Sequence, residues 1–138
     1  MIRSDEESCG DEDFARLLAF RTEVRRFLRW SRATAREAGL HPAQHQLLLV
    51  VRGCDDPDRG PRVSDIAEYL TVDQNTATEI VGRACGAGLV TRERDPDDRR
   101  VVRVRLTEEG RRKIDAVTAL TIRELDGLED VICAFWRQ

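Results

Sequence analysis

Residues 63–110 decide the fold, and they read VSDIAEYLTVDQNTATEIVGRACGAGLVTRERDPDDRRVVRVRLTEEG. Apolar residues recur at helical spacing over Val63–Leu70, and the pattern stops at Thr71–Asp73, which we interpret as a turn. The same spacing predicts a second helix over Gln74–Ala87, closed by the glycine and leucine that follow. Two short helices joined by three residues are typical of a helix-turn-helix.

A basic hairpin follows the second helix. Thr91–Arg94 and Val101–Leu106 are predicted strands, the second with clear alternation of apolar and charged residues. The sequence DPDDRR at 95–100 is rich in turn-forming residues. Residues 91–105 hold six arginines against four acidic residues. A helix for the major groove and a basic hairpin for the neighbouring minor groove would together hold a DNA duplex.

The remainder of the chain reads as helix. A helical pattern runs from Phe14 to about Ala38, and a second helix, whose second half is apolar nearly all round, runs from Ala43 to Arg52. Thr107 is a plausible N-cap for a last long helix. The expected fold is mainly α with a small β-hairpin, a winged helix-turn-helix flanked by long N- and C-terminal dimerisation helices.

These patterns divide the chain into four segments. We expect an acidic disordered tail at 1–12, N-terminal helices for dimerisation and support at 13–52, a winged helix-turn-helix DNA-binding region at 53–106, and a C-terminal dimerisation helix at 107–138. The two terminal helices carry more apolar surface than a small winged helix can cover. Burial against a second copy of the chain, in a two-fold dimer, is the simplest solution. A monomer with its helices folded back on itself is the alternative.

Composition limits the possible functions. The chain has 138 residues, enough for one domain, and a net charge of −3. Residues 1–13 hold six acidic residues and one arginine, so they carry −5 and the rest of the chain carries +2. The local basic hairpin therefore matters more for a nucleic-acid partner than the global charge does. No apolar run is long enough for a membrane span, and no signal peptide is apparent, so a cytoplasmic protein is expected.

Other chemistry finds little support in the residues. No nucleophile elbow, phosphate loop or dinucleotide fingerprint is present, so we expect neither catalytic residues nor a cofactor. The four cysteines are scattered and are expected to be reduced thiols, and Cys9 lies among acidic residues that disfavour a reactive thiolate. His41 and His45 are four residues apart, but Pro42 lies between them and no third ligand is obvious. No metal site is expected.

Several stretches together carry a family resemblance. They are Gly39-Leu40-His41-Pro42-Ala43-Gln44-His45, Gly86-Ala87-Gly88-Leu89-Val90, Asp98-Arg99-Arg100 and Val104-Arg105-Leu106-Thr107-Glu108-Glu109-Gly110. In this order and at this spacing, the chain from about residue 14 onward resembles the MarR family of bacterial transcriptional regulators. The resemblance implies a homodimer that binds palindromic promoter DNA, often as a repressor. It also implies release of DNA by a small, often aromatic effector or by cysteine oxidation.

The recognition helix supplies the first candidate contacts to DNA. Ala77, Ile80, Val81 and Ala84 share one face and should pack inward. Gln74, Asn75, Thr78, Glu79 and Gly82 fall on the other face. The amides of Gln74 and Asn75 can pair with adenine, and Thr76 and Thr78 can reach a phosphate or a thymine methyl group. Asp73 is expected to cap the helix. Glu79 can accept from cytosine N4 or pair with Arg83, which is also a DNA-binding candidate.

The hairpin supplies the second set. By the resemblance, Arg100 corresponds to the family arginine that enters the minor groove, and Asp98 to the acid that orients it. Arg94 and Arg99 are candidate phosphate contacts, or simply solvated charges. Ser64, at the start of the first short helix, is a further phosphate contact or a helix cap.

An effector site, where one exists, is expected between the dimerisation helices and the winged helix. Phe27, Trp30 and His45 are candidates for its lining, although Trp30 fits a core or dimer position equally well. The main prediction is a DNA-binding regulator. The alternative is a winged-helix protein-interaction module or antagonist, because residues 63–113 hold ten basic and ten acidic residues.

Overall fold

The structure is a computed structural model that describes residues 8–136. In chain order its elements are α1 (Asp11–Glu37), α2 (Pro42–Gly53), α3 (Val63–Leu70), α4 (Gln74–Gly86), β1 (Val90–Arg94), β2 (Val102–Leu106) and α5 (Glu108–Trp136). The predicted fold class is confirmed: the chain is mainly helical, with one antiparallel hairpin and long first and last helices. Helix and strand boundaries agree with the sequence prediction within a few residues.

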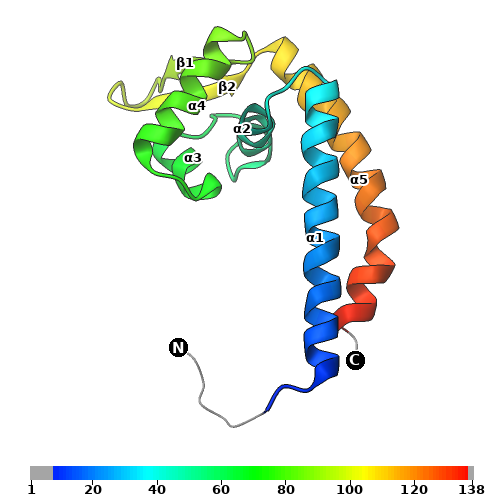
Figure 1. Cartoon of the computed structure of the whole chain (residues 1–138). Helices are drawn as coiled ribbons and strands as arrows, with labels where there is room; N and C mark the ends of the chain where they lie inside the picture. The colour runs from blue at the N-terminus through cyan, green and yellow to red at the C-terminus, as the bar shows by residue number, and fades with distance from the viewer. Residues whose placement is uncertain (1–7, 137–138) are drawn as a thin grey trace.

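The elements form a lobe and an arm (Figure 1). The lobe contains α2, α3, α4 and the hairpin. The arm consists of α1 and α5, which lie side by side and extend away from the lobe. None of the described helices is long and apolar enough to cross a membrane.

The hydrophobic core lies in the lobe and at the adjoining ends of the arm. Its largest fully buried side chains are Leu40, Leu47, Leu48, Ile66, Leu89, Ile114, Val81, Val104 and Val117. Ala77, Val81 and Ala84 of α4 are fully buried, and Ile80 packs against the core, as the helical spacing predicted. The outer half of the arm, by contrast, leaves large apolar side chains exposed.

The first helix begins earlier than predicted. Asp11 and Glu12 were assigned to a disordered tail, but they form the first turn of α1 together with Asp13. Negative side chains are stabilising at a helix N-terminus, and Asp13 Oδ2 also accepts a hydrogen bond from the Gly10 amide at 3.0 Å. The prediction for residues 1–7 lies outside the described residues.

The segment before α3 joins the hairpin, although its sequence indicates only a polar loop. Arg62 pairs with Arg103 in an isolated bridge, and the Val104 amide donates to the Pro61 carbonyl at 2.9 Å. This pairing requires a glycine at position 60. Gly60 has a φ of +84°, and a Cβ there would collide with the Val104 carbonyl. The hairpin is thus fastened to the chain that leads into α3.

A second junction connects the hairpin to the arm. Thr107 Oγ1 accepts from the Gly110 amide at 3.0 Å, which confirms Thr107 as the α5 N-cap, and it donates to the Gly88 carbonyl at 2.6 Å. The Thr107 amide donates to the Leu89 carbonyl at 3.0 Å. Because a Cβ at Gly110 would collide with that same carbonyl, the first turn of α5 lies directly against the end of the α4–β1 connection.

Candidate nucleic-acid interface

Helix α4 begins with a side-chain cap that leaves its polar residues outside. Asp73 Oδ1 accepts from the Thr76 amide at 2.7 Å, as expected for an N-cap. This backbone hydrogen bond holds the pKa of Asp73 below its ordinary value. Because the inward face of α4 is filled by small and apolar side chains, Gln74, Asn75 and Thr78 are exposed at its N-terminal end. Helix N-termini in this position are suited to contact base edges.

The α4 candidates do not all share one face. Thr78 is exposed, and its hydroxyl donates to the Gln74 carbonyl at 2.8 Å. Thr76 is half-buried and lines a groove against the N-terminal end of α2. Arg83 lines the same groove two turns later, and so does Glu79. Within the described residues no ion pair joins Glu79 to Arg83, so the i,i+4 pairing that was one of the two alternatives for Glu79 is not formed.

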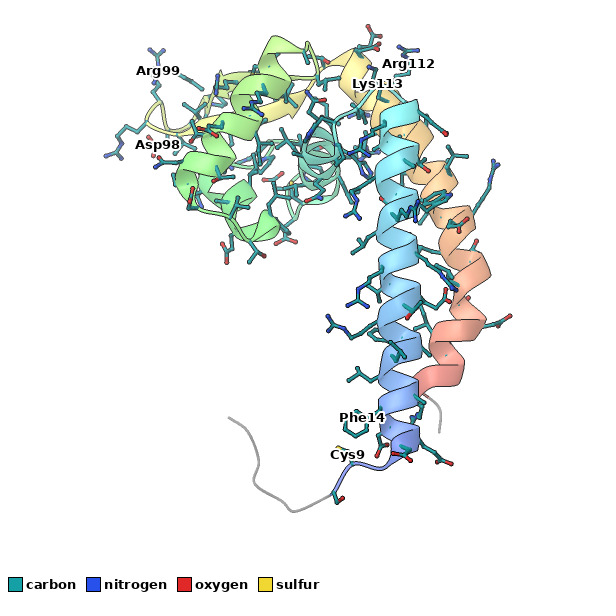
Figure 2. The ribbon with its side chains drawn as sticks, viewed as in Figure 1. Cys9, Phe14, Asp98, Arg99, Arg112 and Lys113 are labelled. Atoms are coloured by element: carbon teal, nitrogen blue, oxygen red, sulfur yellow. The ribbon has the colours of Figure 1, made fainter. Side chains whose placement is uncertain are left out.

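The hairpin tip presents its arginines to solvent. Figure 2 shows Asp98 and Arg99 at the end of the hairpin, on the far side of the lobe from α5. Asp98 Oδ1 accepts from the backbone amide of Arg100 at 3.1 Å and from its Nε at 3.3 Å. The Arg100 side chain nevertheless remains 92% exposed. Asp98 therefore orients an arginine that is otherwise free to meet an anion.

The shape of the tip depends on two further contacts. Arg94 Nη1 donates to the Arg99 carbonyl at 2.8 Å, so Arg94 holds the loop in place at the end of β1. Next to it, Asp95 is only 4% exposed and accepts from the amides of Asp97 and Asp98 at 2.7 and 3.2 Å. The hydrogen bond from the Asp97 amide, followed by the one from the Arg103 guanidinium, holds the pKa of Asp95 below its ordinary value.

Sequence reasoning missed three residues of this surface. Asp95 and Arg103 were not considered beyond the hairpin charge count, yet Arg103 Nε donates to Asp95 Oδ2 at 2.9 Å and Nη1 donates to the Gly60 carbonyl at 3.2 Å. Arg92 of β1 is exposed, and its Nη2 would lie 3.6 Å from a Cβ at Gly82. Arg92 therefore extends from β1 to the outward face of α4. Because side chains alternate between the two faces of a strand, the position of Arg92 on β1 could have indicated that it is a candidate for this surface.

Ser64 is exposed in the first turn of α3 but does not cap it. The N-cap is Arg62, whose backbone amide donates to Asp65 Oδ2 at 3.0 Å. The Arg62 guanidinium also pairs with Asp65, with 3.1 Å between Nη2 and Oδ1, and this hydrogen bond lowers the pKa of Asp65. The Ser64 hydroxyl therefore has no role in starting the helix.

The three effector candidates lie in different surroundings. Phe27 and Trp30 stack on α1 with 6.2 Å between ring centroids. Phe27 lines a small cavity of about 80 Å³ between α1 and α5, whose walls include neither Trp30 nor His45. His45 is buried in α2, and this burial lowers its pKa. Ligand pockets commonly enclose about 300–1,000 Å³, so this cavity in a single chain is too small for one.

The sequence and the fold both have known relatives. A model of the MarR family matches residues 38–101. Over 78 residues the chain is 28% identical to the uncharacterized HTH-type transcriptional regulator YdgJ of Bacillus subtilis, a match that covers 56% of this chain and 45% of that protein. The match thus spans about half the length of this curated relative.

Solved structures extend the likeness to almost the whole chain. A MarR family protein from Bacillus stearothermophilus is 26% identical, with a TM-score of 0.75 over 94% of this chain and 92% of that one. A mutant of S. aureus MepR bound to an oligodeoxyribonucleotide has 20% identity and a TM-score of 0.61, covering 83% and 79% of the two chains. CouR from Rhodococcus jostii RHA1 bound to p-coumaroyl-CoA has 21% identity and a TM-score of 0.67, covering 95% and 98%.

Proposed function

The chain belongs to the MarR family of transcriptional regulators, and we propose that it binds double-stranded promoter DNA as a two-fold dimer and regulates transcription. One observation carries this proposal. The exposed polar end of α4 lies in the same lobe as a hairpin whose tip presents Arg99 and Arg100 to solvent. The family consists of regulators rather than enzymes, in agreement with the lack of catalytic motifs in the sequence.

The proposed contacts divide by groove. Gln74, Asn75 and Thr78 read base edges in the major groove, because amides at a helix N-terminus can pair with adenine. Arg100 enters the adjacent minor groove. The remaining candidates, which are Ser64, Thr76, Arg83, Arg94 and Arg99, contact phosphates or support those that do. Asp98 serves as the internal partner of Arg100, since its carboxylate already accepts two hydrogen bonds from that residue.

The arm is the proposed dimer interface. Large apolar side chains remain exposed along it: Phe14, Leu17, Leu18, Val24, Leu28, Leu120, Ile122, Leu125 and Ile132. Figure 2 shows Phe14 on the side of α1 that faces away from α5, so packing within one chain leaves it uncovered. A second copy related by a two-fold axis would cover these side chains and present two lobes to a palindromic operator.

We also propose that the protein is a repressor and that a small aromatic effector releases it from DNA. Support comes from relatives of this fold, since MepR is found with an oligodeoxyribonucleotide and CouR with p-coumaroyl-CoA. Phe27, Trp30 and His45 remain the proposed lining. Since the cavity beside Phe27 is too small in one chain, the second subunit would have to complete the site.

The test is a mobility-shift or fluorescence-anisotropy titration with the DNA that flanks the gene encoding this protein. The expected result is saturable binding that competitor DNA of random sequence does not abolish. An Arg100→Ala variant serves as the control, because it should bind more weakly while remaining folded. Absence of binding at physiological salt would favour a protein-interaction module, which the near-neutral charge of residues 63–113 also fits.

A further inference from the structure

Asp95 is a charged residue in a buried position, and its surroundings give it a specific task. Burial of a carboxylate is unfavourable unless hydrogen bonds replace its hydration. Asp95 is 4% exposed, and its two oxygens accept from two backbone amides of the tip and from the Arg103 guanidinium. The Asp95 amide in turn donates to the Val101 carbonyl at 2.9 Å, which closes the loop. Asp95 thereby fixes the shape of the loop that carries Arg99 and Arg100.

Arg103 transmits this arrangement to the rest of the lobe. Its guanidinium donates to Asp95 on one side and to the Gly60 carbonyl on the other, and the side chain is only 21% exposed. A planar guanidinium with donors in fixed directions can bridge two segments in a way that a lysine ammonium cannot. Two residues after Gly60, Arg62 caps α3. The Arg103 side chain therefore connects the hairpin tip to the segment that leads into α3, in addition to the backbone pairing of that segment with β2.

We propose that Asp95 and Arg103 are positioning residues for DNA binding: together with the Gly60 carbonyl they form a brace that sets the wing tip relative to the helix-turn-helix. This rests on the proposed DNA-binding function. Recognition by helix and wing requires both to reach adjacent grooves of one duplex at the same time. The brace makes no DNA contact itself. It keeps Arg100 where the minor groove lies when α4 is seated in the major groove.

The brace should respond to substitution in a way that runs against simple electrostatics. Asp95→Asn removes a negative charge close to DNA, and by charge alone it should strengthen binding. The Asn amide has one acceptor oxygen where the carboxylate has two, so it cannot accept both from Arg103 and from the backbone amides of the tip. We therefore expect the brace to open and affinity to fall about tenfold, the size of one base-edge contact. Arg103→Lys keeps the positive charge but loses the planar guanidinium that donates to both Asp95 and Gly60, and it should weaken binding to a similar extent.

The experiment compares these variants with Arg105→Lys, a matched control on the same strand. Arg105 pairs with Glu93 at 3.6 Å outside the brace and is 47% exposed, so its substitution by lysine should leave affinity within about twofold of wild type. Anisotropy titrations over a range of salt concentrations give the affinity and the salt slope. Circular dichroism melting of each variant establishes that the titrations are carried out on folded protein.

A double-variant cycle separates positioning from general stability. When the brace acts through Arg100, Asp95→Asn adds little to the loss caused by Arg100→Ala, and the two effects are strongly non-additive. Fully additive losses would overturn the inference, and so would stronger binding by Asp95→Asn. Arg103→Lys repeats the cycle in a variant that keeps every charge.

A measurement without DNA keeps the inference distinct from the proposed function. Amide hydrogen exchange of Asp97, Asp98 and Arg100 in the free protein should accelerate in Asp95→Asn and in Arg103→Lys, and not in Arg105→Lys. Wild-type protein that does not bind DNA would refute the proposed function. Unchanged exchange at the wing tip in both brace variants would refute the brace itself, whatever the wild-type protein binds.

Discussion

At the scale of single residues, Arg100 and Asp73 differ in how much of the side chain remains open to solvent or to a partner. Arg100 is held at its Nε by Asp98 and is otherwise open to solvent. Asp73 is occupied by a backbone amide in the first turn of α4. Substitution of Arg100 is therefore expected to affect DNA binding, and substitution of Asp73 to affect the stability of the fold.

Arg100→Ala should weaken DNA binding by about tenfold, the effect of one groove contact. The melting temperature should hardly change, because the side chain makes no contact with the core. Arg112→Ala removes the same charge on α5, far from the hairpin tip (Figure 2), where Arg112 pairs with Glu109. Anisotropy with an operator fragment compares the two. Equal losses would show that overall charge, rather than the position of Arg100, drives binding.

Asp73 predicts a pH dependence of stability. Its folded pKa lies below the ordinary value of 3.8, so its contribution is present above that pH and is lost as the pH falls through the folded pKa. Asn is an equally good N-cap but does not titrate. Asp73→Asn should match wild type near neutral pH and lose less stability between about pH 5 and pH 3. Thermal melts across that range provide the measurement, and parallel curves for the two proteins would contradict the assignment.

At the scale of elements, helix α4 and the hairpin are expected to perform different tasks. Asn75→Ala or Gln74→Ala should relax base preference at one position of each half-site, since a bidentate amide–adenine pair discriminates by roughly 1–3 kcal/mol. Arg99→Ala should weaken all sequences alike and reduce the salt slope by about one unit, because it removes one contact to a phosphate. Selection of binding sites from a pool of random DNA sequences, repeated for each variant, tests this division. If Arg99→Ala changed base preference and the α4 variants did not, this division of tasks would be wrong.

The elements also show what a sequence can predict by itself. Helical spacing located α3 and α4, and Asp73 and Thr107 marked helix starts, because these signals are local. The contacts of Asp95 with Arg103 and of Arg103 with Gly60 were not predictable, because they join residues 8 and 43 positions apart. The wrong prediction for Asp11 and Glu12 has a local cause. Acidic residues suggest disorder as a group, yet they are favourable in a helix's first turn.

At the scale of the whole molecule, dimer formation should depend on the outer part of the arm. Phe14→Glu combined with Leu18→Glu places two charges one helical turn apart on apolar surface that is 65% and 63% exposed in the single chain. Sedimentation at micromolar concentration should give about twice 15.7 kDa for wild type and about one chain mass for the variant. Leu49→Glu, an equally apolar exposed site on α2, should remain dimeric. If the Phe14→Glu, Leu18→Glu double variant stayed dimeric, the interface would lie elsewhere.

The junction at Thr107 has a consequence for the DNA. Through the Gly88 and Leu89 carbonyls it fastens the start of α5 to the end of the α4–β1 connection. In a dimer held together by its arms, the two recognition helices are therefore separated by a fixed span, with little freedom to rotate independently. B-DNA completes a turn in about 10–10.5 base pairs. Adding about five base pairs between the half-sites would turn one of them to the opposite side of the duplex, out of reach of its helix. Adding a single pair would already twist it away by about a tenth of a turn. A dimer that binds DNA as proposed would therefore depend on the helical phase of its two half-sites as well as on their sequence, and the Thr107 junction would limit how far each lobe can rotate relative to the arm.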